Sequence, residues 1–229
     1  MCVSNRMARR RTRKTRRKWK GGNVPTFHVL IVTSGRQSIC TMLKSLASQL
    51  KENDAITLVF DGKFAKKKST FTDVSLQKMN MKCKVNVKEQ VPGLKHYGHP
   101  TINVTLPTLD PPTTYVMFAD DDDFYSEGAF DALRNKCKDP DILYVAKMQN
   151  SGGLIPPEGT KAIEGGKIAK VNGIIPFKER ASAKMGETGY AGDFEYYNVL
   201  KDKVKGVEFL DDIIYHATPL PDISDGNSE

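Results

Sequence analysis

Short apolar runs of strand length recur along this chain, and helix-sized connections separate them. These runs are rich in β-branched and aromatic residues and lie at 27–33, 56–60, 83–87, 115–119 and 142–146. Apolar residues at helical spacing predict an amphipathic helix over about 37–51. A second helix is expected after Ser126, whose hydroxyl can cap it. Strands that alternate with helices predict an α/β fold, a Rossmann-like, doubly wound mixed sheet in a single domain.

The segment from 150 to 192 departs from this alternation. Glycine and proline punctuate it, and Ile174-Ile175 is typical of its short apolar runs. This composition predicts short strands and mobile loops, and loops at the edge of a rigid sheet commonly carry binding residues. We therefore expect one domain over 25–220, followed by a polar tail at 221–229.

Positive charge is concentrated at the start of the chain. Ten of the 35 Lys and Arg residues lie in the first 25 positions, which contain no Asp or Glu, so the remainder has 25 basic and 27 acidic side chains. Residues 1–24 have little to pack, and we expect a disordered basic leader that contacts acidic surfaces. A flexible leader with no specific role is an equal alternative. The nearly neutral body indicates no specific nucleic-acid partner.

Cysteine usage and hydropathy bear on the compartment. The four cysteines form no C-x-x-C pair, and three of them lie in apolar patterns, as buried free thiols do. This favours a reducing compartment and gives no zinc site. No apolar stretch reaches membrane-spanning length, so we expect a soluble, cytoplasmic protein without a transmembrane segment.

Four consecutive aspartates, Asp120 to Asp123, follow the apolar strand at 115–119 without a linker. In open α/β sheets, ligands bind beyond the carboxyl ends of the strands. Four adjacent carboxylates repel one another, and a divalent cation is the usual means of relieving that repulsion. Because alternate residues point in opposite directions, at most two of the four should face one metal ion. A solvated acidic turn is the plain alternative, but the strand before the cluster favours a metal site.

Two other turns are expected at the same edge of the sheet. The first strand ends in Thr33-Ser34-Gly35-Arg36, where small residues let a ligand approach the backbone and Arg36 can meet a phosphate. The second strand ends in Asp61, whose carboxylate could accept a hydrogen bond from a base or a ribose. Each turn is weak evidence by itself, because Thr-Ser-Gly and Asp-Gly turns are common without any ligand.

Asp193 and His216 also have a candidate role. Asp193 follows a glycine-bearing loop and begins a helical stripe of apolar residues, so its carboxylate caps the helix or serves as a base. His216 follows the apolar Ile213-Ile214-Tyr215 and is a structural imidazole unless the fold brings it to the aspartates. Carboxylates with one imidazole would favour Mn²⁺ somewhat over Mg²⁺.

These marks, taken in their order along the chain, resemble the GT-A glycosyltransferases over about 26–218. The DXD signature of that family looks like Asp120 to Asp123 and their flanking residues, in a wording similar to that of the β-1,3-glucuronyltransferases. The family's acidic helix start looks like Gly189-Tyr-Ala-Gly-Asp193-Phe-Glu. The opening strand and turn, Val29 to Arg36, and the C-terminal His216 complete the set. The small size and basic leader also resemble the N-terminal glycosyltransferase modules of chlorovirus proteins that build capsid glycans.

The resemblance implies a GT-A fold and an inverting transfer of a glucose- or rhamnose-like hexose or deoxyhexose from a UDP-sugar donor. The acceptor would be a hydroxyl of a glycan or glycoprotein, in viral capsid glycosylation in the host cytoplasm. The resemblance also implies Mn²⁺ or Mg²⁺ held by Asp122 and His216, and Asp193 as the catalytic base. The residues implied for the donor are Thr33, Ser34, Gly35, Arg36, Asp61, Lys95, His96, Asn103, Asp120 and Asp121. Among them, Asp121 would hold the ribose and Asp61 would contact the uracil.

Two departures from the family pattern bear on these roles. The residue before Asp193 is a glycine where the family has a glutamate. The Arg-Asn pair that precedes the DXD strand in the family stands here as Ile102-Asn103. Without that arginine the diphosphate contact is open, and Lys95, His96 or His99 could take its place.

Two other classes of function fit parts of the sequence. A sugar-phosphate nucleotidyltransferase also uses a doubly wound sheet and a divalent metal, but it would want a glycine-rich basic loop after the first strand. Thr33 to Arg36 is a poor version of such a loop. A non-enzymatic binding module led by the basic leader would show salt-sensitive binding that is lost on deletion of 1–24.

Overall fold

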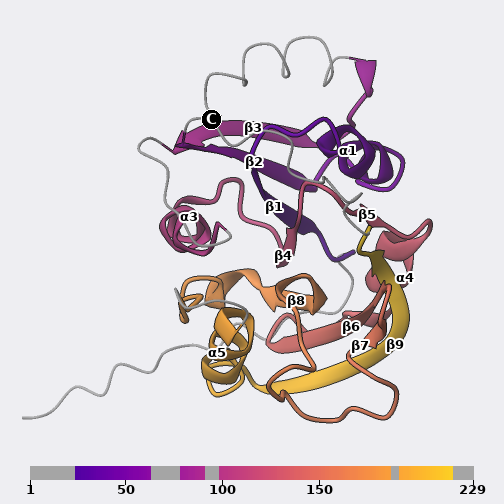
Figure 1. Ribbon diagram of the computed structural model, residues 1–229, viewed down its shortest axis with the longest axis vertical. Coiled ribbons are helices and arrows are strands. Elements are labelled where there is room, and N and C mark those ends of the chain that lie inside the picture. The colour runs from indigo at the N-terminus through magenta and orange to yellow at the C-terminus, as the bar shows by residue number, and fades with distance from the viewer. Residues whose placement is uncertain (1–23, 63–77, 91–97, 187–190, 219–229) are drawn as a thin grey trace, which may run out of the picture.

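The computed structural model describes residues 24–62, 78–90, 98–186 and 191–218, whose elements are drawn in Figure 1. The strands are β1 (Phe27–Thr33), β2 (Ala55–Asp61), β3 (Lys84–Gln90), β4 (Tyr115–Ala119), β5 (Phe124–Tyr125), β6 (Ile142–Asn150), β7 (Gly153–Ile155), β8 (Gly173–Pro176) and β9 (Gly206–His216). The helices are α1 (Ile39–Ala47), α3 (His99–Thr105), α4 (Ala129–Lys136) and α5 (Gly192–Leu200), with short 3-10 helices η3 (Leu106–Thr108), η4 (Lys170–Asn172) and η5 (Phe177–Glu179). The segments 1–23 and 219–229, which hold the expected leader and tail, and the candidates Lys95 and His96 lie outside the described residues.

The described strands form one nine-stranded mixed sheet, which confirms the predicted α/β fold. Its order is β3-β2-β1-β4-β8-β6-β9-β5, and β7 pairs with β6. The first four strands of that order run parallel. β8 is antiparallel to both β4 and β6, and β9 runs parallel to β6. The carboxyl ends of β1, β2, β4, β6 and β9 therefore lie at one edge of the sheet, together with the amino end of β8.

Helices cover both faces of this sheet. α1 and α4 pack on one face, at the right of Figure 1, and α3 and α5 pack on the other, at the left. In β1, Val29 and Ile31 face the first pair of helices, while Leu30 faces the second. A strand buried on both sides needs apolar residues at almost every position, which explains the continuous apolar runs of the sequence. No helix in the described part of the chain is long and apolar enough to cross a membrane.

Some helix boundaries differ from the sequence-based expectations. The helix expected over 37–51 is shorter and spans Ile39–Ala47, although Leu50 beyond it is still buried. The prediction that Ser126 caps the next helix is wrong. Its hydroxyl donates instead to the carbonyl of Ile213 at 2.8 Å, because the chain is still following β9 at this point. Gly128, in the left-handed region with φ of 76°, precedes the helix in its place.

Two strands that shape the carboxyl edge were not located from the sequence: β8 was expected only as one of the short strands of 150–192, and no strand was expected at β9. β8 has four residues within the glycine- and proline-rich segment, too few to establish a periodic pattern. β9 has eleven residues, but register shifts against β6 break its alternation of buried and exposed positions. As a result, η4 and His216 reach the edge of the sheet where β4 ends.

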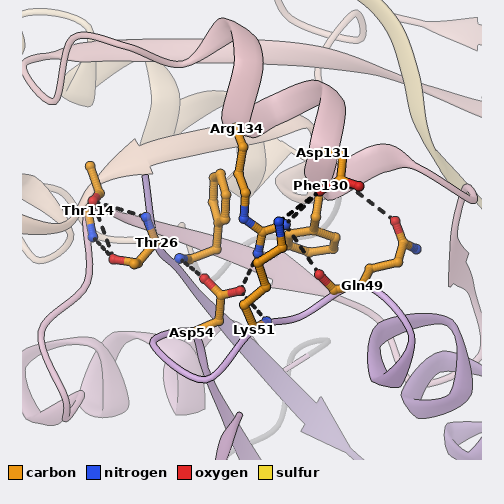
Figure 2. Close-up of polar contacts among 9 residues, drawn as sticks. Thr26, Gln49, Lys51, Asp54, Thr114, Phe130, Asp131 and Arg134 are labelled. Carbon is orange, nitrogen blue, oxygen red and sulfur yellow. Dashed lines mark hydrogen bonds and ion pairs between the residues drawn. The ribbon is translucent and has the colours of Figure 1, made fainter. Parts of the chain in front are cut away.

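A buried ion pair joins several elements at the opposite, amino edge of the sheet (Figure 2). The Asp54 carboxylate receives the guanidinium of Arg134 and the backbone N–H groups of Phe27, at 2.8 Å, and Lys51, at 2.7 Å. The guanidinium also lies over the rings of Phe27 and Phe130, which contact each other edge to face. The pair thus links α4 to the starts of β1 and β2.

We expect Arg134→Met to lower the free energy of unfolding by about 3–5 kcal/mol, because it leaves the Asp54 charge buried without its counter-charge. Urea unfolding measures this change. The double variant Asp54→Asn/Arg134→Met should recover part of the loss. Lys51→Met is the matched control, since the Lys51–Asp131 pair is exposed on both sides and contributes little. Similar losses for Arg134→Met and Lys51→Met would contradict this role of the buried pair.

His28 is a buried imidazole on β1. Its Nε2 lies 2.8 Å from the hydroxyl of Thr57, and its Nδ1 lies 3.3 Å from the carbonyl oxygen of Pro111. A neutral ring satisfies both contacts by donating from Nδ1 and accepting at Nε2. Burial lowers the pKa of His28 to about 4.

The protein should therefore lose stability as the pH falls from about 6.5 toward 4. In that window the unfolded chain binds a proton at His28 and the folded chain does not, a linkage of about 3 kcal/mol. Unfolding free energies of the wild type and of His28→Gln, measured from neutral pH down to about pH 4.5, isolate this group from all others. The wild type should lose more stability than the variant, and parallel pH profiles would contradict the prediction.

Candidate functional site

The four aspartates form the turn that follows β4, and their exposure alternates. Asp121 and Asp123 are buried, whereas the side chains of Asp120 and Asp122 are 38% and 21% exposed. This is the pattern expected when neighbouring residues point to opposite sides of the chain. Two carboxylates, those of Asp120 and Asp122, are therefore available to a ligand.

The two buried acids tie the turn to other segments. Asp121 Oδ2 accepts hydrogen bonds from the hydroxyl of Thr33, at 2.6 Å, and from the N–H of Ser34, at 3.1 Å. Asp123 Oδ1 accepts one from the N–H of Thr218, just beyond β9, at 2.8 Å. Burial raises the pKa of both acids, that of Asp123 to about 6. Asp123, which carries no predicted role, thus anchors the turn from within the protein.

The two exposed acids each face a cation. Arg36 Nη1 lies 2.6 Å from Asp122 Oδ2, and Lys170 Nζ lies 2.5 Å from Asp120 Oδ1. Arg36 reaches the turn because Gly35 adopts φ of 76° and donates its N–H to the Thr33 hydroxyl, which turns the chain after β1 toward the aspartates. The predicted proximity of this turn to the aspartates is thus present in the structure. Lys170 was not singled out from the sequence.

Sheet topology brings Lys170 to the aspartates. Because β8 runs antiparallel to β4, the 3-10 helix η4 before it lies where β4 ends. The Asn172 side chain fixes η4 by donating to backbone carbonyls of β6 and β7 at 3.0 and 2.8 Å. The hydroxyl of Tyr197, from α5, donates to the carbonyl of Lys170 at 2.6 Å. The backbone that carries the ammonium is therefore held on two sides.

Asp193 lies in the first turn of α5, where the helical pattern placed it. Its Oδ2 accepts the backbone N–H of Lys170 at 2.9 Å, and its Oδ1 lies 3.2 Å from Nε2 of His99. Lys170 thus contacts Asp193 through its main chain and Asp120 through its ammonium. The structure places the candidate base next to the aspartate turn.

His99 is held between two hydrogen-bond acceptors. Its Nδ1 donates to the carbonyl of Gly186 at 2.9 Å, and its Nε2 faces the carboxylate of Asp193. A neutral imidazole has one N–H, so the imidazolium is the form that satisfies both contacts. The contact with Asp193 raises the pKa of His99, and its effect outweighs the opposing effect of burial. His99, considered from the sequence as a diphosphate contact, faces the carboxylate of the candidate base.

Gly192 is required by the packing around His99. A Cβ at this position would lie 2.5 Å from the carbonyl oxygen of Gly186 and 2.7 Å from Nδ1 of His99. Real Cβ atoms do not approach other atoms so closely, so the imidazole and the two segments at 186 and 192 exclude any side chain. This contact explains why glycine, and not the glutamate of the family pattern, precedes Asp193.

We expect Gly192→Ala to destabilise the protein and to displace His99 from Asp193. A double variant, His99→Ala/Gly192→Ala, opens the space that the new methyl group needs, so its loss of stability should be smaller than the sum of the two single losses. Thermal or urea unfolding of all four proteins measures this coupling. Additive losses would show that the glycine and the imidazole do not constrain each other.

The remaining candidates lie around α3 and at the end of β9. Asp61 Oδ2 accepts the hydroxyl of Thr101 at 3.0 Å. The amide of Asn103 exchanges two hydrogen bonds with the backbone of Met185, at 2.9 and 2.8 Å, so both of its polar atoms hold that segment. Asp61, at the end of β2, is thus bound to α3, and Asn103 of α3 is bound to the backbone of Met185. Among the described contacts, neither residue touches the four aspartates.

His216 lies beside the aspartate turn. It pairs with Phe124 across the sheet, and the two rings stack with centroids 5.0 Å apart. Phe124 comes two residues after Asp122, so the sheet brings His216 to the strand that follows the turn.

The donor groups of the turn suit a hard divalent cation that arrives with further ligands. Within the described ranges, no group of three or more His, Cys, Asp and Glu side chains is arranged to hold a metal ion. Carboxylate oxygens are the ligands that Mg²⁺ and Mn²⁺ prefer, and Mg²⁺ is commonly bound by one or two carboxylates together with substrate phosphates. Asp120 and Asp122 fit such a shared site, in which phosphate oxygens and water complete the coordination.

The fold is one that known glycosyltransferases have. The mannosyltransferase PcManGT from Pyrobaculum calidifontis, in complex with GDP-Man and Mn²⁺, matches with a TM-score of 0.59 and 9% identity, over 91% of this chain and 62% of that one. The glycosyltransferase GlyE of Streptococcus pneumoniae TIGR4 matches with a TM-score of 0.50 and 14% identity, over 82% and 45%. S. aureus TarS 1–349, in complex with UDP, matches with a TM-score of 0.61 and 19% identity, over 85% of this chain and 60% of TarS.

These likenesses establish the architecture, a curled mixed α/β sheet in a single domain, as the sequence predicted. No family model matches the sequence, and no curated protein does. The chain spans 60% of the length of TarS 1–349.

Proposed function

We propose that this protein is a metal-dependent, inverting glycosyltransferase that moves a hexose or deoxyhexose from a UDP-sugar to a hydroxyl of a glycan or glycoprotein. The observation that carries the proposal is that a single residue joins Asp193 to the aspartate turn. Both contact Lys170, at the edge of the sheet where α/β proteins bind their ligands. The UDP bound to TarS and the GDP-Man and Mn²⁺ bound to PcManGT support a nucleotide-sugar donor and a divalent metal. A capsid glycoprotein as acceptor rests on the sequence resemblance alone.

We assign residues to the metal and the donor from the exposure of the four aspartates. Asp122 and His216 are the residues that would hold the cation, and Asp120 would support them from the other exposed position of the turn. Asp121 is buried against Thr33 and Ser34, so we assign it to fixing the turn that lines the nucleotide and its ribose. Asp61 stays our candidate for the uracil. A bound divalent cation would supply Lewis-acid stabilisation of the negative charge on the departing nucleotide.

Asp193 provides the base for a single displacement. The oxygen of the acceptor hydroxyl forms a bond to the anomeric carbon, and its proton passes to the Asp193 carboxylate. The bond between that carbon and the phosphate oxygen breaks, and its electron pair leaves with UDP. Attack from the face opposite to the leaving group inverts the anomeric carbon. The imidazole of His99 faces one carboxylate oxygen of Asp193 and the Lys170 N–H is bound to the other, so the base is oriented before the acceptor binds.

A thermal-shift screen of uridine and guanosine sugar nucleotides, with and without Mn²⁺, tests the donor class. A donor at a hundredfold excess over its Kd stabilises the folded state by about 2.7 kcal/mol, which for a chain of this size raises Tm by about 5 °C or more. We expect this shift with a UDP-sugar and Mn²⁺ together. No metal-dependent shift with any sugar nucleotide would overturn the proposal. A shift with nucleoside triphosphates and sugar phosphates instead would favour a nucleotidyltransferase.

Asp193→Asn should keep the Mn²⁺-dependent thermal shift and lose turnover. Loss of the general base lowers the rate on the order of a hundredfold or more, measured as release of UDP from the donor that the screen identifies. Glu195→Gln is the matched control, because Glu195 is an exposed carboxylate in the same turn of α5. Strong residual turnover in Asp193→Asn, or an equal loss in Glu195→Gln, would remove Asp193 from the mechanism.

A further inference from the structure

Lys170 is a buried cation, and the steps assigned above to Asp193 give no role to its ammonium. Its side chain is 13% exposed, and its ammonium lies 2.5 Å from Asp120. This ion pair places a positive charge in the interior of the site.

The position of the ammonium is set by both halves of the site. The main chain of Lys170 is bound to Asp193, and its side chain is bound to the aspartate turn. Asn172 and Tyr197 hold the backbone at this point, so the long side chain starts from a fixed base. One residue therefore joins the aspartate turn, through its ammonium, to Asp193, through its main chain.

Charge balance indicates what the ammonium meets there. Asp120 is shared between Lys170 and any divalent cation that binds the turn, and the two positive charges compete for one carboxylate. A buried ammonium that loses part of its counter-charge needs another anion nearby. A phosphate oxygen is such an anion, and lysine binds phosphates as a point charge.

We propose that Lys170 binds the diphosphate of the donor at the phosphate next to the sugar, exchanging Asp120 for a phosphate oxygen when metal and donor enter. This inference rests on the proposed function and names a residue for the diphosphate contact that is left open by Ile102, which stands where the family pattern has an arginine. Because Lys170 joins the turn to Asp193, we assign its ammonium to the phosphate nearest the reacting carbon. Lys170 stays on that phosphate as the leaving group acquires its charge.

The test compares two nucleotides that differ in this phosphate. Titration calorimetry with Mn²⁺ gives the Kd of UDP and of UMP for the wild type and for Lys170→Met. We expect the variant to lose about tenfold or more in affinity for UDP, the effect of one hydrogen bond to a charged group, and to bind UMP almost unchanged. Lys147→Met is the matched control. Lys147 is also a buried lysine paired with an aspartate, Asp211, at 2.9 Å, but it lies on β6 without a contact to the turn.

The outcomes separate this inference from the proposed function. Equal losses for UDP and UMP in Lys170→Met, or the same loss of UDP affinity in Lys147→Met, would show a structural role and overturn the inference. A wild type that binds neither nucleotide with Mn²⁺ would overturn the proposed function first. If Lys170→Met does not fold, Asp120→Asn and Asp120→Asn/Lys170→Met are compared instead, because the double variant leaves no buried charge without a partner. The preference for UDP over UMP must fall between these two proteins, and an unchanged preference would overturn the inference.

Discussion

Four neighbouring negative charges at the end of a buried strand are the constraint that organises the carboxyl edge of this protein. Each acid satisfies its charge on another part of the chain: the turn after β1, the 3-10 helix before β8, or the backbone just past β9. These contacts offset the repulsion within the cluster, and they join segments that are far apart in sequence. The two acids that face solvent, Asp120 and Asp122, pair with Lys170 and Arg36. In the proposed function a metal ion replaces such a side-chain cation, which then binds a phosphate. The two that face inward keep hydroxyl and N–H donors, which stay in place.

Much of this edge follows from the sequence, because central parallel strands leave continuous apolar runs and their carboxyl ends must meet. Thr33 to Arg36 and the aspartates are therefore predicted to lie together, and the family resemblance adds Asp193 to them. The position of Lys170 and the pairing of His99 with Asp193 could not be predicted in the same way. The position of Lys170 depends on a four-residue strand inserted antiparallel beside β4, and a strand so short has no periodicity to detect. His99 begins a helix of seven residues whose composition did not suggest one.

A departure from a family pattern at one position can be compensated elsewhere in space. Gly192 lacks the carboxylate that the resemblance leads one to expect, yet the room it leaves is filled by the imidazole of His99. The Nε2 of that imidazole lies 3.2 Å from the carboxylate of Asp193. A comparison along the sequence records a missing acid, whereas the structure shows a histidine and a glycine that depend on each other.

The Asp54–Arg134 pair lies at the amino edge, at the other end of the strands that carry the aspartate turn and Asp61 (Figure 2). The contacts that keep the sheet and its helices together are therefore separated by the length of a strand from those that a ligand meets. Substitutions in the segments at the carboxyl edge leave this anchor untouched. Because of this separation, residues at the carboxyl edge can be replaced one at a time while the chain still folds.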